Sequence, residues 1–334
     1  MRIVATAEVP PVAREAFARL GTIEVAAAGD GHALAGAEVL IVRGTRLDAA
    51  MLARAGRLRV IARTGAGYDN VDVEAATRLR VPVVYAPGIG SRPIAEGTLA
   101  LILAATKRLR ELGAVVHESD WATRYGVVGL DIEGACLGVV GYGAIGREVG
   151  RLCSALGMHV IAHDPDAAQS PEMVSLPELL ARADVITLHC ALNDRTRGLV
   201  DRRFLARVKA GAILVNAARG HIVESEDALA DALLAGRLSA VALDVFPTEP
   251  PRAGHRLYAD PRVICTPHTV GLTRRWNKEV FHALARGVES VLAGEHPGNL
   301  LNPDAISAGA AASTTPSWSP ESDFRPRRSG QPRS

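Results

Sequence analysis

Residues 137–150 read LGVVGYGAIGREVG and place Gly141, Gly143 and Gly146 in G-x-G-x-x-G spacing. An apolar run precedes the glycines, a helical pattern follows them, and a second apolar run, HVIAH, leads into Asp164, 18 residues after Gly146. Three glycines in this spacing are a weak signal alone. A strand, a helix, a second strand and an acidic residue in this order predict one βαβ unit that binds a dinucleotide.

The three glycines of the motif have different steric roles. Gly141 permits a sharp turn, Gly143 lets the backbone approach a pyrophosphate, and Gly146 lets the helix pack closely on the strand. The helix N-terminus offers unpaired N–H groups and a partial positive charge to the phosphates. Asp164 is expected to accept hydrogen bonds from the adenosine ribose, and with Asp166 nearby it should repel a 2′-phosphate. NAD is therefore expected over NADP, and the alternative is a glycine-rich turn without a ligand.

Short Val- and Ile-rich runs alternate with Ala-, Leu- and Arg-rich helical patterns along most of the chain, which predicts parallel sheets with helices on both faces. The strand-like runs are RIVAT, AEVLIV, RVIAR and VPVVY in the first part, and CLGVVG, HVIAHD, ADVITLHC, AILVNAA, AVALDVF and RVICTP in the second. We therefore expect an α/β fold with two Rossmann-like, doubly wound parallel-sheet domains and an active-site cleft between them.

The domain boundaries follow from helix signals and composition. A long helix is expected from Pro93 to Gly113, punctuated by proline at its start and glycine at its end. A final helix near residues 275–293 is free to return to the first domain. We expect a substrate domain of residues 1–92 plus 272–302, an NAD-binding domain of residues 93–271, and a disordered Ser/Pro/Gly/Arg-rich tail of residues 303–334.

Composition excludes several classes of protein. The 334 residues carry a net charge of +2, which gives no reason to expect a nucleic-acid or anionic-membrane partner. The N-terminus lacks the pattern of a signal peptide, and no apolar run is long enough for a transmembrane helix. We expect a cytoplasmic protein whose four cysteines are free and mostly buried thiols, namely Cys136, Cys153, Cys190 and Cys265.

Three chemically distinct side chains follow three successive strand-like runs. Arg219 follows AILVNAA, Glu249 follows AVALDVF within PTEP, and His268 follows RVICTP. Parallel strands end at one edge of a sheet, where ligands of such folds bind. Histidine is suited to carry the proton in alcohol oxidation, a carboxylate orients it and favours its protonated form, and arginine binds a carboxylate or a developing oxyanion. These residues are the predicted catalytic set.

Singly, each of these residues has a simpler interpretation. A loop arginine is usually solvated, and a glutamate between prolines usually belongs to a surface turn. A metal site at His268 is not expected, because His255 and His282 lack ligand spacing to it. The coincidence of the three residues at consecutive strand ends beside a dinucleotide fold favours catalysis.

Six motifs together resemble the D-isomer-specific 2-hydroxyacid dehydrogenases, nearest the phosphoglycerate dehydrogenase branch. The resemblance extends over about residues 1–302. The motifs are VVGYGAIGREVG…HDP, LVNAARGHIVESEDALADAL, ALDVFPTEP, TPHTVG, RTGAGYDNVD and APG…AEGTLALILA. The resemblance implies a catalytic set of Arg219, Glu249 and His268, a substrate domain formed by both ends of the chain, and a homodimer built partly around the Pro93–Gly113 helix. The implied cofactor contacts are Ala144, Ile145, Asp164, Cys190, Ala217, Ala218, Arg219, Asp244, and residues from His268 to Gly271. The implied substrate-carboxylate contacts are Gly65, Ala66 and Gly67, with Arg219.

Departures from the family bear on the substrate. Tyr85 and Gly90 stand where relatives often carry asparagine, and Glu249 stands where formate-oxidising relatives carry glutamine. Arg63 and Arg92 are candidates to supply positive charge to the far end of the substrate, which predicts a small polar acid of the hydroxypyruvate, glyoxylate or phosphoglycerate type. Tyr68, Tyr85 and Ile89 could instead line an apolar pocket. A short form without the regulatory domain of longer phosphoglycerate dehydrogenases is expected.

The overall expectation is an NAD-dependent D-2-hydroxyacid dehydrogenase or 2-keto acid reductase. A binding protein remains the competing class, because the same family includes NAD-sensing transcriptional corepressors that keep the Arg–Glu–His set.

Overall fold

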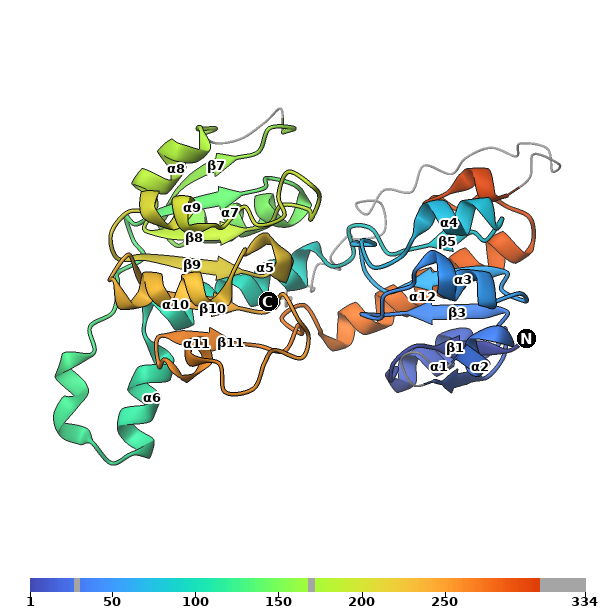
Figure 1. Ribbon diagram of the computed structural model, residues 1–334, viewed down its shortest axis with the longest axis horizontal. Helices are drawn as coiled ribbons and strands as arrows, with labels where there is room; N and C mark the ends of the chain where they lie inside the picture. Colours follow the sequence, from blue (N-terminus) through green and yellow to red (C-terminus); the bar gives the residue numbers. More distant parts are fainter. Residues whose placement is uncertain (27–30, 168–171, 307–334) are drawn as a thin grey trace, which may run out of the picture. The chain divides into compact units, whose positions relative to one another are not determined.

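The computed structural model describes residues 1–26, 31–167 and 172–306 (Figure 1). The chain forms two compact units, one of Met1–Gly90 together with the chain from Arg274 onward, and one of Ser91–Thr273. The boundaries between the units fall at 90/91 and 273/274, whereas the sequence pattern predicted them two residues away, at 92/93 and 271/272. Most of the expected tail lies outside the described residues. Pro303–Ala305 forms a 3-10 helix, η3, with Ala305 buried, so the ordered chain extends past the boundary expected at residue 303.

The first unit is built on a five-stranded parallel sheet with the order β2-β1-β3-β4-β5. Its strands are β1 (Ile3–Ala5), β2 (Ile23–Val25), β3 (Val39–Val42), β4 (Val60–Arg63) and β5 (Val83–Val84). Its helices are α1 (Pro11–Phe17), α2 (Gly31–Ala35), α3 (Ala49–Arg54), α4 (Val73–Arg78) and α12 (Arg274–Leu292). One apolar core joins the sheet to α1 and α12, and a second joins it to α3 and α4, so helices cover both faces.

The second unit is built on a six-stranded parallel sheet with the order β11-β10-β9-β8-β6-β7. Its strands are β6 (Cys136–Val140), β7 (His159–His163), β8 (Val185–Leu188), β9 (Ala212–Asn216), β10 (Leu238–Leu243) and β11 (Val263–Cys265). Its α-helices are α5 (Ser91–Thr106), α6 (Leu109–His117), α7 (Ala144–Ala155), α8 (Leu176–Arg182), α9 (Arg202–Arg207), α10 (Glu226–Leu234) and α11 (Arg256–Ala259), and its 3-10 helices are η1 (Trp121–Gly126) and η2 (Gly220–Ile222). Helices α5 and α7 pack on one face, and α8, α9 and α10 on the other. The predicted α/β class with two parallel sheets is confirmed.

The strand order fixes where a ligand can bind. In the second unit the order reverses at β6, which has β7 on one side and β8 on the other. Ligands of open α/β sheets bind beyond the carboxyl ends of the strands at such a switch point. The residues that follow β6 and β8 are Gly141 and His189–Cys190, so the glycine stretch lies at the position that this rule selects.

The expected helix from Pro93 to Gly113 is wrong as a single element. Helix α5 ends at Thr106 and α6 begins at Leu109, because Arg108 adopts a left-handed backbone conformation with φ 53°. The Arg108 guanidinium pairs with Glu111 one turn later, which holds the break in place. No glycine or proline marks the break in the sequence, so the helical pattern runs through it unchanged.

The cysteines are free, as expected, but they are not mostly buried. Cys153 is buried, Cys136 and Cys190 are partly buried, and Cys265 is exposed. Within the described ranges, none of the helices combines the length and apolar character that crossing a bilayer requires.

Candidate active site

In the glycine loop between β6 and α7, close backbone packing requires glycine at two of the three motif positions. Gly141 has φ 91°, and a side-chain carbon on it would overlap the backbone of Cys190. A side-chain carbon on Gly146 would overlap the carbonyl oxygen of Gly141. At Gly143, no described atom outside the two neighbouring residues lies within 4 Å of the position of such a carbon. The loop is therefore tight at both ends and open at its centre, where a phosphate would approach.

Helix α7 begins at Ala144 and Ile145 with Gly143 as its N-cap, and no side chain of the described residues caps it. Across the loop, Asp164 follows β7 and accepts hydrogen bonds from the N–H of Tyr142 at 2.7 Å and of Asp166 at 2.9 Å. Each carboxylate oxygen keeps a lone pair for a further donor. An uncapped helix start, an open glycine and an anchored carboxylate fit the phosphates and ribose of a dinucleotide.

His268 and Glu249, from loops after two neighbouring strands, are in direct contact. His268 Nδ1 lies 2.9 Å from Glu249 Oε2 and 3.0 Å from Oε1. Burial raises the pKa of the Glu249 carboxyl, but the hydrogen bond from His268 and the charges of His268 and Arg219 outweigh it, so the pKa lies below its usual value. A proton on Nδ1 that is donated to this carboxylate leaves Nε2 with its lone pair. Both side chains remain nearly half exposed, which keeps them accessible to a substrate.

Arg219 is held in place by the turn after β9. The buried Asn216 side chain accepts a hydrogen bond from the N–H of Ala218 at 3.0 Å and donates one to the carbonyl of Arg219 at 3.0 Å. A side-chain carbon on Gly220 would overlap the backbone of Phe246. The loops that carry Arg219 and Glu249 are therefore in backbone contact, and Arg219 contributes to lowering the pKa of Glu249.

Asp244 organises the loop that carries His268. The residue is 3% exposed, and its carboxylate accepts hydrogen bonds from the hydroxyl of Thr266 and from the N–H groups of Thr269 and Val270. Its backbone carbonyl accepts the N–H of His268 at 2.7 Å. Burial raises the pKa of Asp244, and these hydrogen bonds oppose that rise. A predicted cofactor contact is thus also the anchor of the loop, which allows His268 its left-handed φ of 55°.

Helix α5 packs directly against the loop that carries His268. A side-chain carbon on Gly97 would overlap Val270, and one on Gly271 would lie 2.6 Å from Cγ1 of Ile94. Two glycines, one on each partner, therefore allow the helix and the loop to approach closely.

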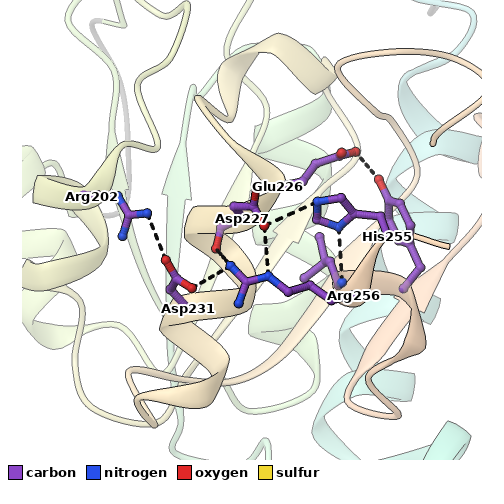
Figure 2. Close-up of polar contacts among 8 residues, drawn as sticks. Arg202, Glu226, Asp227, Asp231, His255 and Arg256 are labelled. Atoms are coloured by element: carbon purple, nitrogen blue, oxygen red, sulfur yellow. Dashed lines mark hydrogen bonds and ion pairs between the residues drawn. The ribbon is translucent and has the colours of Figure 1, made fainter. Parts of the chain in front are cut away.

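Figure 2 shows a charged network that joins α9, α10 and α11. Arg256 binds Asp227 at 2.9 Å and Asp231 at 2.6 Å, and Arg202 also binds Asp231. The Tyr258 hydroxyl donates to Glu226, and its ring packs edge-on against Phe246 with 5.6 Å between ring centroids. The N–H of Phe246 donates to Glu249 Oε1 at 3.2 Å. Tyr258, which is bound to Glu226, thus packs against Phe246, and Phe246 in turn donates the hydrogen bond to Glu249.

The first unit contains the predicted substrate turn, Gly65–Gly67, directly after β4. Gly65 has φ 113°, and its carbonyl accepts the N–H of Ala86 at 3.1 Å. Arg63 Nε donates to Asn70 Oδ1 at 2.9 Å, and the Asn70 amide donates to the carbonyls of Arg43 and Thr45. Asn70 therefore ties together the loops after β3 and β4.

Arg92, a candidate for substrate charge, is paired with two carboxylates of its own unit. Its guanidinium binds Glu96 and Glu148, each at 2.5 Å. Among the described residues, no group of three or more His, Cys, Asp or Glu side chains is placed to hold a metal ion.

The second unit brings Arg219, Glu249 and His268 to three successive strand ends, as the sequence predicted. The other predicted cofactor contacts lie at the same sheet edge: Ala217 and Ala218 follow β9, and Cys190 follows β8, where burial raises its pKa to about 11. Sequence reasoning missed Asn70, Gly97, Asn216 and Gly220, which orient the loops. Gly97 and Gly220 are required only by contacts with chain distant in sequence, and no local pattern marks them.

Comparisons with known proteins agree with this geometry. Residues 99–270 match the family model described as D-isomer specific 2-hydroxyacid dehydrogenase, NAD binding domain. The chain is 42% identical over 280 residues to D-3-phosphoglycerate dehydrogenase of Mycobacterium tuberculosis, covering 82% of this chain and 52% of that protein. It therefore spans about half the length of this relative.

Two further matches cover most of both chains. Glyoxylate reductase of Aeropyrum pernix is 37% identical over 273 residues, which is 78% of this chain and 81% of that protein. The crystal structure of the TT0316 protein from Thermus thermophilus aligns with a TM-score of 0.83 and 35% identity, over 90% of this chain and 100% of that one. The chain belongs to the D-isomer-specific 2-hydroxyacid dehydrogenase family, and residues 99–270 match the model of that family's NAD-binding domain.

Proposed function

We propose that the protein is an NAD-dependent D-2-hydroxyacid dehydrogenase that interconverts a 2-hydroxy acid and its 2-keto acid. The observation that carries the proposal is the contact of His268 Nδ1 with the Glu249 carboxylate at 2.9 Å, beside Arg219 on the NAD-binding domain. Proton transfer, imidazole orientation and anion binding are the three tasks that this reaction sets for side chains.

In the direction of oxidation, His268 Nε2 takes the proton of the substrate hydroxyl as the carbon loses hydride. Because the pKa of Glu249 is lowered, its carboxylate is ionised at neutral pH. This negative charge keeps the proton on Nδ1 of His268 and stabilises the imidazolium that forms. In the direction of reduction the same imidazolium returns the proton to the carbonyl oxygen. Arg219 stabilises the negative charge on that oxygen and on the substrate carboxylate.

The cofactor would supply the hydride chemistry, with NAD as the acceptor in oxidation and NADH as the donor in reduction. Gly143, Ala144 and Ile145 would face its pyrophosphate, and Asp164 would accept from the adenosine ribose hydroxyls, because these groups are open or keep unused lone pairs. Cys190, Ala217, Ala218, Asp244 and Gly271 are the further proposed contacts.

The substrate carboxylate is proposed to bind the backbone N–H groups of Gly65, Ala66 and Gly67 together with Arg219. Gly65 with its φ of 113° shapes this turn, and Ala66 is exposed. Arg63 lies against the turn, since a side-chain carbon on Gly65 would come 3.3 Å from Arg63 Nη1. Backbone N–H groups in such a turn form a concave site for an anion.

The far end of the substrate is proposed to be small and polar or anionic. Arg43 directly follows β3 and Arg63 ends β4, so both lie at the carboxyl edge of the first sheet. The Arg63 guanidinium donates to Asn70 Oδ1, and the Arg43 guanidinium donates to the carbonyl of Glu8 at 2.7 Å. Burial lowers the pKa of Arg43, which means that its charge lacks part of its hydration and favours an anionic neighbour. The names of the relatives, phosphoglycerate dehydrogenase and glyoxylate reductase, agree with a small polar acid.

The test is a screen of 2-keto acids with NADH, which compares kcat/KM for hydroxypyruvate, glyoxylate and 2-ketoisocaproate. The proposal predicts turnover, with a polar acid preferred by tenfold or more, or about 1.4 kcal/mol of transition-state binding. A tenfold preference for 2-ketoisocaproate would contradict the polar site and favour a pocket lined by Tyr68, Tyr85 and Ile89. Cofactor binding with negligible turnover on every acid would contradict the enzymatic proposal and favour an NAD-sensing binding protein.

The protein is further proposed to form a homodimer through the segment that follows α5. Helix α6 has no buried residue in the structure, and Figure 1 shows it extending away from the sheet of its own unit. We call residues 109–128 the projecting arm. Its exposed apolar side chains are Leu109, Val116, Trp121, Tyr125 and Val128. A run of exposed apolar side chains on one projecting segment marks an interaction surface.

A further inference from the structure

The chain that leaves α12 returns along the edge of the first sheet. Leu300 forms an antiparallel bridge with Val84, and the N–H of Leu301 donates to the carbonyl of Val83 at 2.8 Å. Strand β5 is the last strand of the sheet order, so this returning segment covers an edge that would otherwise present unpaired backbone groups. The segment also contains two asparagines whose side-chain amides make different contacts.

Asn299 holds both backbone groups of Tyr85. Its carbonyl oxygen accepts the N–H of Tyr85 at 3.0 Å, and its side-chain Nδ2 donates to the carbonyl of Tyr85 at 2.9 Å. The same Nδ2 lies 3.4 Å from the carbonyl of Ala283 on α12. A side-chain carbon on Gly287 would come 2.8 Å from Asn299 Oδ1, so the amide is seated tightly between α12 and Tyr85.

Tyr85 and its neighbour Ala86 are linked in turn to the segment 65–68. The N–H of Ala86 donates to the carbonyl of Gly65 at 3.1 Å. The Tyr85 ring packs edge-on against the Tyr68 ring, with 6.1 Å between centroids and an interplanar angle of 86°. One contact fixes the peptide that begins the glycine turn, and the other fixes the residue that follows it.

We infer that Asn299 is a positioning residue for the substrate turn Gly65–Gly67, acting through Tyr85 and Ala86. The inference rests on the proposed function, because it takes this turn as the carboxylate site. Gly65 has φ 113° and the conformational freedom of glycine, so its carbonyl direction depends on the hydrogen bond from Ala86. Displacing one carbonyl re-aims the N–H groups that follow it, and a carboxylate bound by backbone N–H groups loses affinity when they diverge.

Asn302 provides a matched control in the same segment. Its amide donates to Thr77 Oγ1 and to the carbonyl of Val81, each at 3.0 Å, and accepts the N–H of Val83 at 2.7 Å. It is more deeply buried than Asn299, at 5% exposed, and none of these three bonds reaches the turn or the residues that hold it. Loss of the Asn302 amide should therefore reduce stability without disturbing the turn.

The experiment compares Asn299→Asp, Asn299→Ala and Asn302→Ala with the wild-type chain, using NADH and the best keto acid from the screen. Asn299→Asp keeps the side-chain shape but replaces the donor to the Tyr85 carbonyl with an acceptor. For both Asn299 variants the inference predicts a KM raised by about fivefold or more, with kcat and the Kd for NADH within about twofold. For Asn302→Ala it predicts a lower Tm and a KM within about twofold of wild type.

Hydrogen exchange of segments 64–69 and 85–88 is measured in the same variants without substrate or cofactor. The inference predicts faster exchange of both segments in the Asn299 variants but not in Asn302→Ala. It is overturned if exchange of segment 64–69 is unchanged in Asn299→Asp, or if KM rises equally in the Asn302 control. A wild-type chain that turns over no keto acid would sink the proposed function, while the exchange data would still decide whether Asn299 positions the turn.

Discussion

Gly97 of α5 and Val270, two residues after His268, approach so closely that a side-chain carbon on Gly97 would overlap both the carbonyl oxygen and the Cγ2 of Val270. The Val270 N–H is bound to the buried Asp244 carboxylate, so the loop is held from the opposite side and cannot simply retreat. The position of His268 therefore depends on a helix that contributes no side chain to the proposed chemistry.

Gly97→Ala should displace the loop of His268–Gly271 and reduce activity. Overpacking of this kind costs roughly 1–3 kcal/mol, and a shift of the proton carrier should lower kcat by about tenfold or more. Tm and kcat with NADH and a keto acid measure the two effects. Gly113→Ala in α6 is the control, because its added carbon would meet no described atom within 4 Å apart from its chain neighbours and the backbone of its own helix. Equal kcat in Gly97→Ala and wild type would contradict the dependence on α5.

Cofactor selectivity should depend on Asp164. We expect NAD to bind at least about tenfold tighter than NADP, a gap of about 1.4 kcal/mol, because the carboxylate repels a 2′-phosphate. Asp164→Ser should narrow the gap, mainly by weakening NAD. Fluorescence titrations with NADH and NADPH provide the dissociation constants. Equal constants for the two cofactors in the wild-type chain would show that Asp164 does not face the ribose.

Glu148 should make stability depend on pH in the acid range. Its hydrogen bonds to Arg151, opposed by burial and reinforced by Arg92 of α5, lower the pKa of Glu148 from 4.5 to about 2. A carboxyl group whose pKa is lowered in the folded state stabilises that state above pH 4.5, and this contribution is lost as the pH falls from 4.5 towards 2. Glu148→Gln should therefore lower the free energy of unfolding at pH 7 by about 1 kcal/mol, given the exposure of both arginines.

Urea unfolding of wild type and Glu148→Gln between pH 7 and pH 3 checks this expectation, since the difference between them should shrink as the pH falls. Glu74→Gln serves as the control, because the Glu74 side chain is 92% exposed and its ion pair is 3.9 Å long. A difference that stays constant down to pH 3 would mean that the ion pairs of Glu148 do not contribute to stability.

The projecting arm should govern oligomeric state. Replacing Trp121 and Tyr125 by serine removes two side chains that are 63% and 79% exposed, so the fold of a single chain should keep its Tm. If a second copy covers these rings, the double variant should dissociate at concentrations where wild type remains a dimer. Light scattering coupled to size-exclusion chromatography gives the mass directly. A monomeric wild-type chain at micromolar concentration would refute the homodimer.

The fold was largely predictable because the strands of both sheets are short apolar runs separated by helical patterns. Strand β2 (Ile23–Val25) was missed because only Ile23 of its three residues is buried, so the run lacks an apolar signature. The helix break at Arg108 was missed because it depends on a left-handed residue paired with Glu111, and neither is a recognised breaker. Such features depend on contacts and backbone strain that periodicity does not report.

The site residues that follow strands and have a distinct chemical capacity could be predicted from the sequence. The residues that orient the loops through packing and hydrogen bonds could not. Arg219, Glu249 and His268 could be found because each follows a strand and each has a distinct chemical capacity. Asn216 lies within the strand-like run AILVNAA, where a buried amide has no periodic signal. Its role becomes visible only from its hydrogen bonds to Ala218 and Arg219.

The pH dependence of kcat/KM for oxidation of the hydroxy acid, compared between wild type and Glu249→Gln, tests the central claim most directly. In oxidation His268 acts as a base, so activity rises with pH as the imidazolium loses its proton. Glutamine removes the carboxylate that stabilises the imidazolium, and the account predicts that the ascending limb moves to lower pH, with a lower maximal rate. His268→Ala, which should retain the Kd for NADH, shows which part of the profile belongs to the histidine. An ascending limb at the same pH in Glu249→Gln and wild type would contradict the proposed pairing of His268 with Glu249 in catalysis.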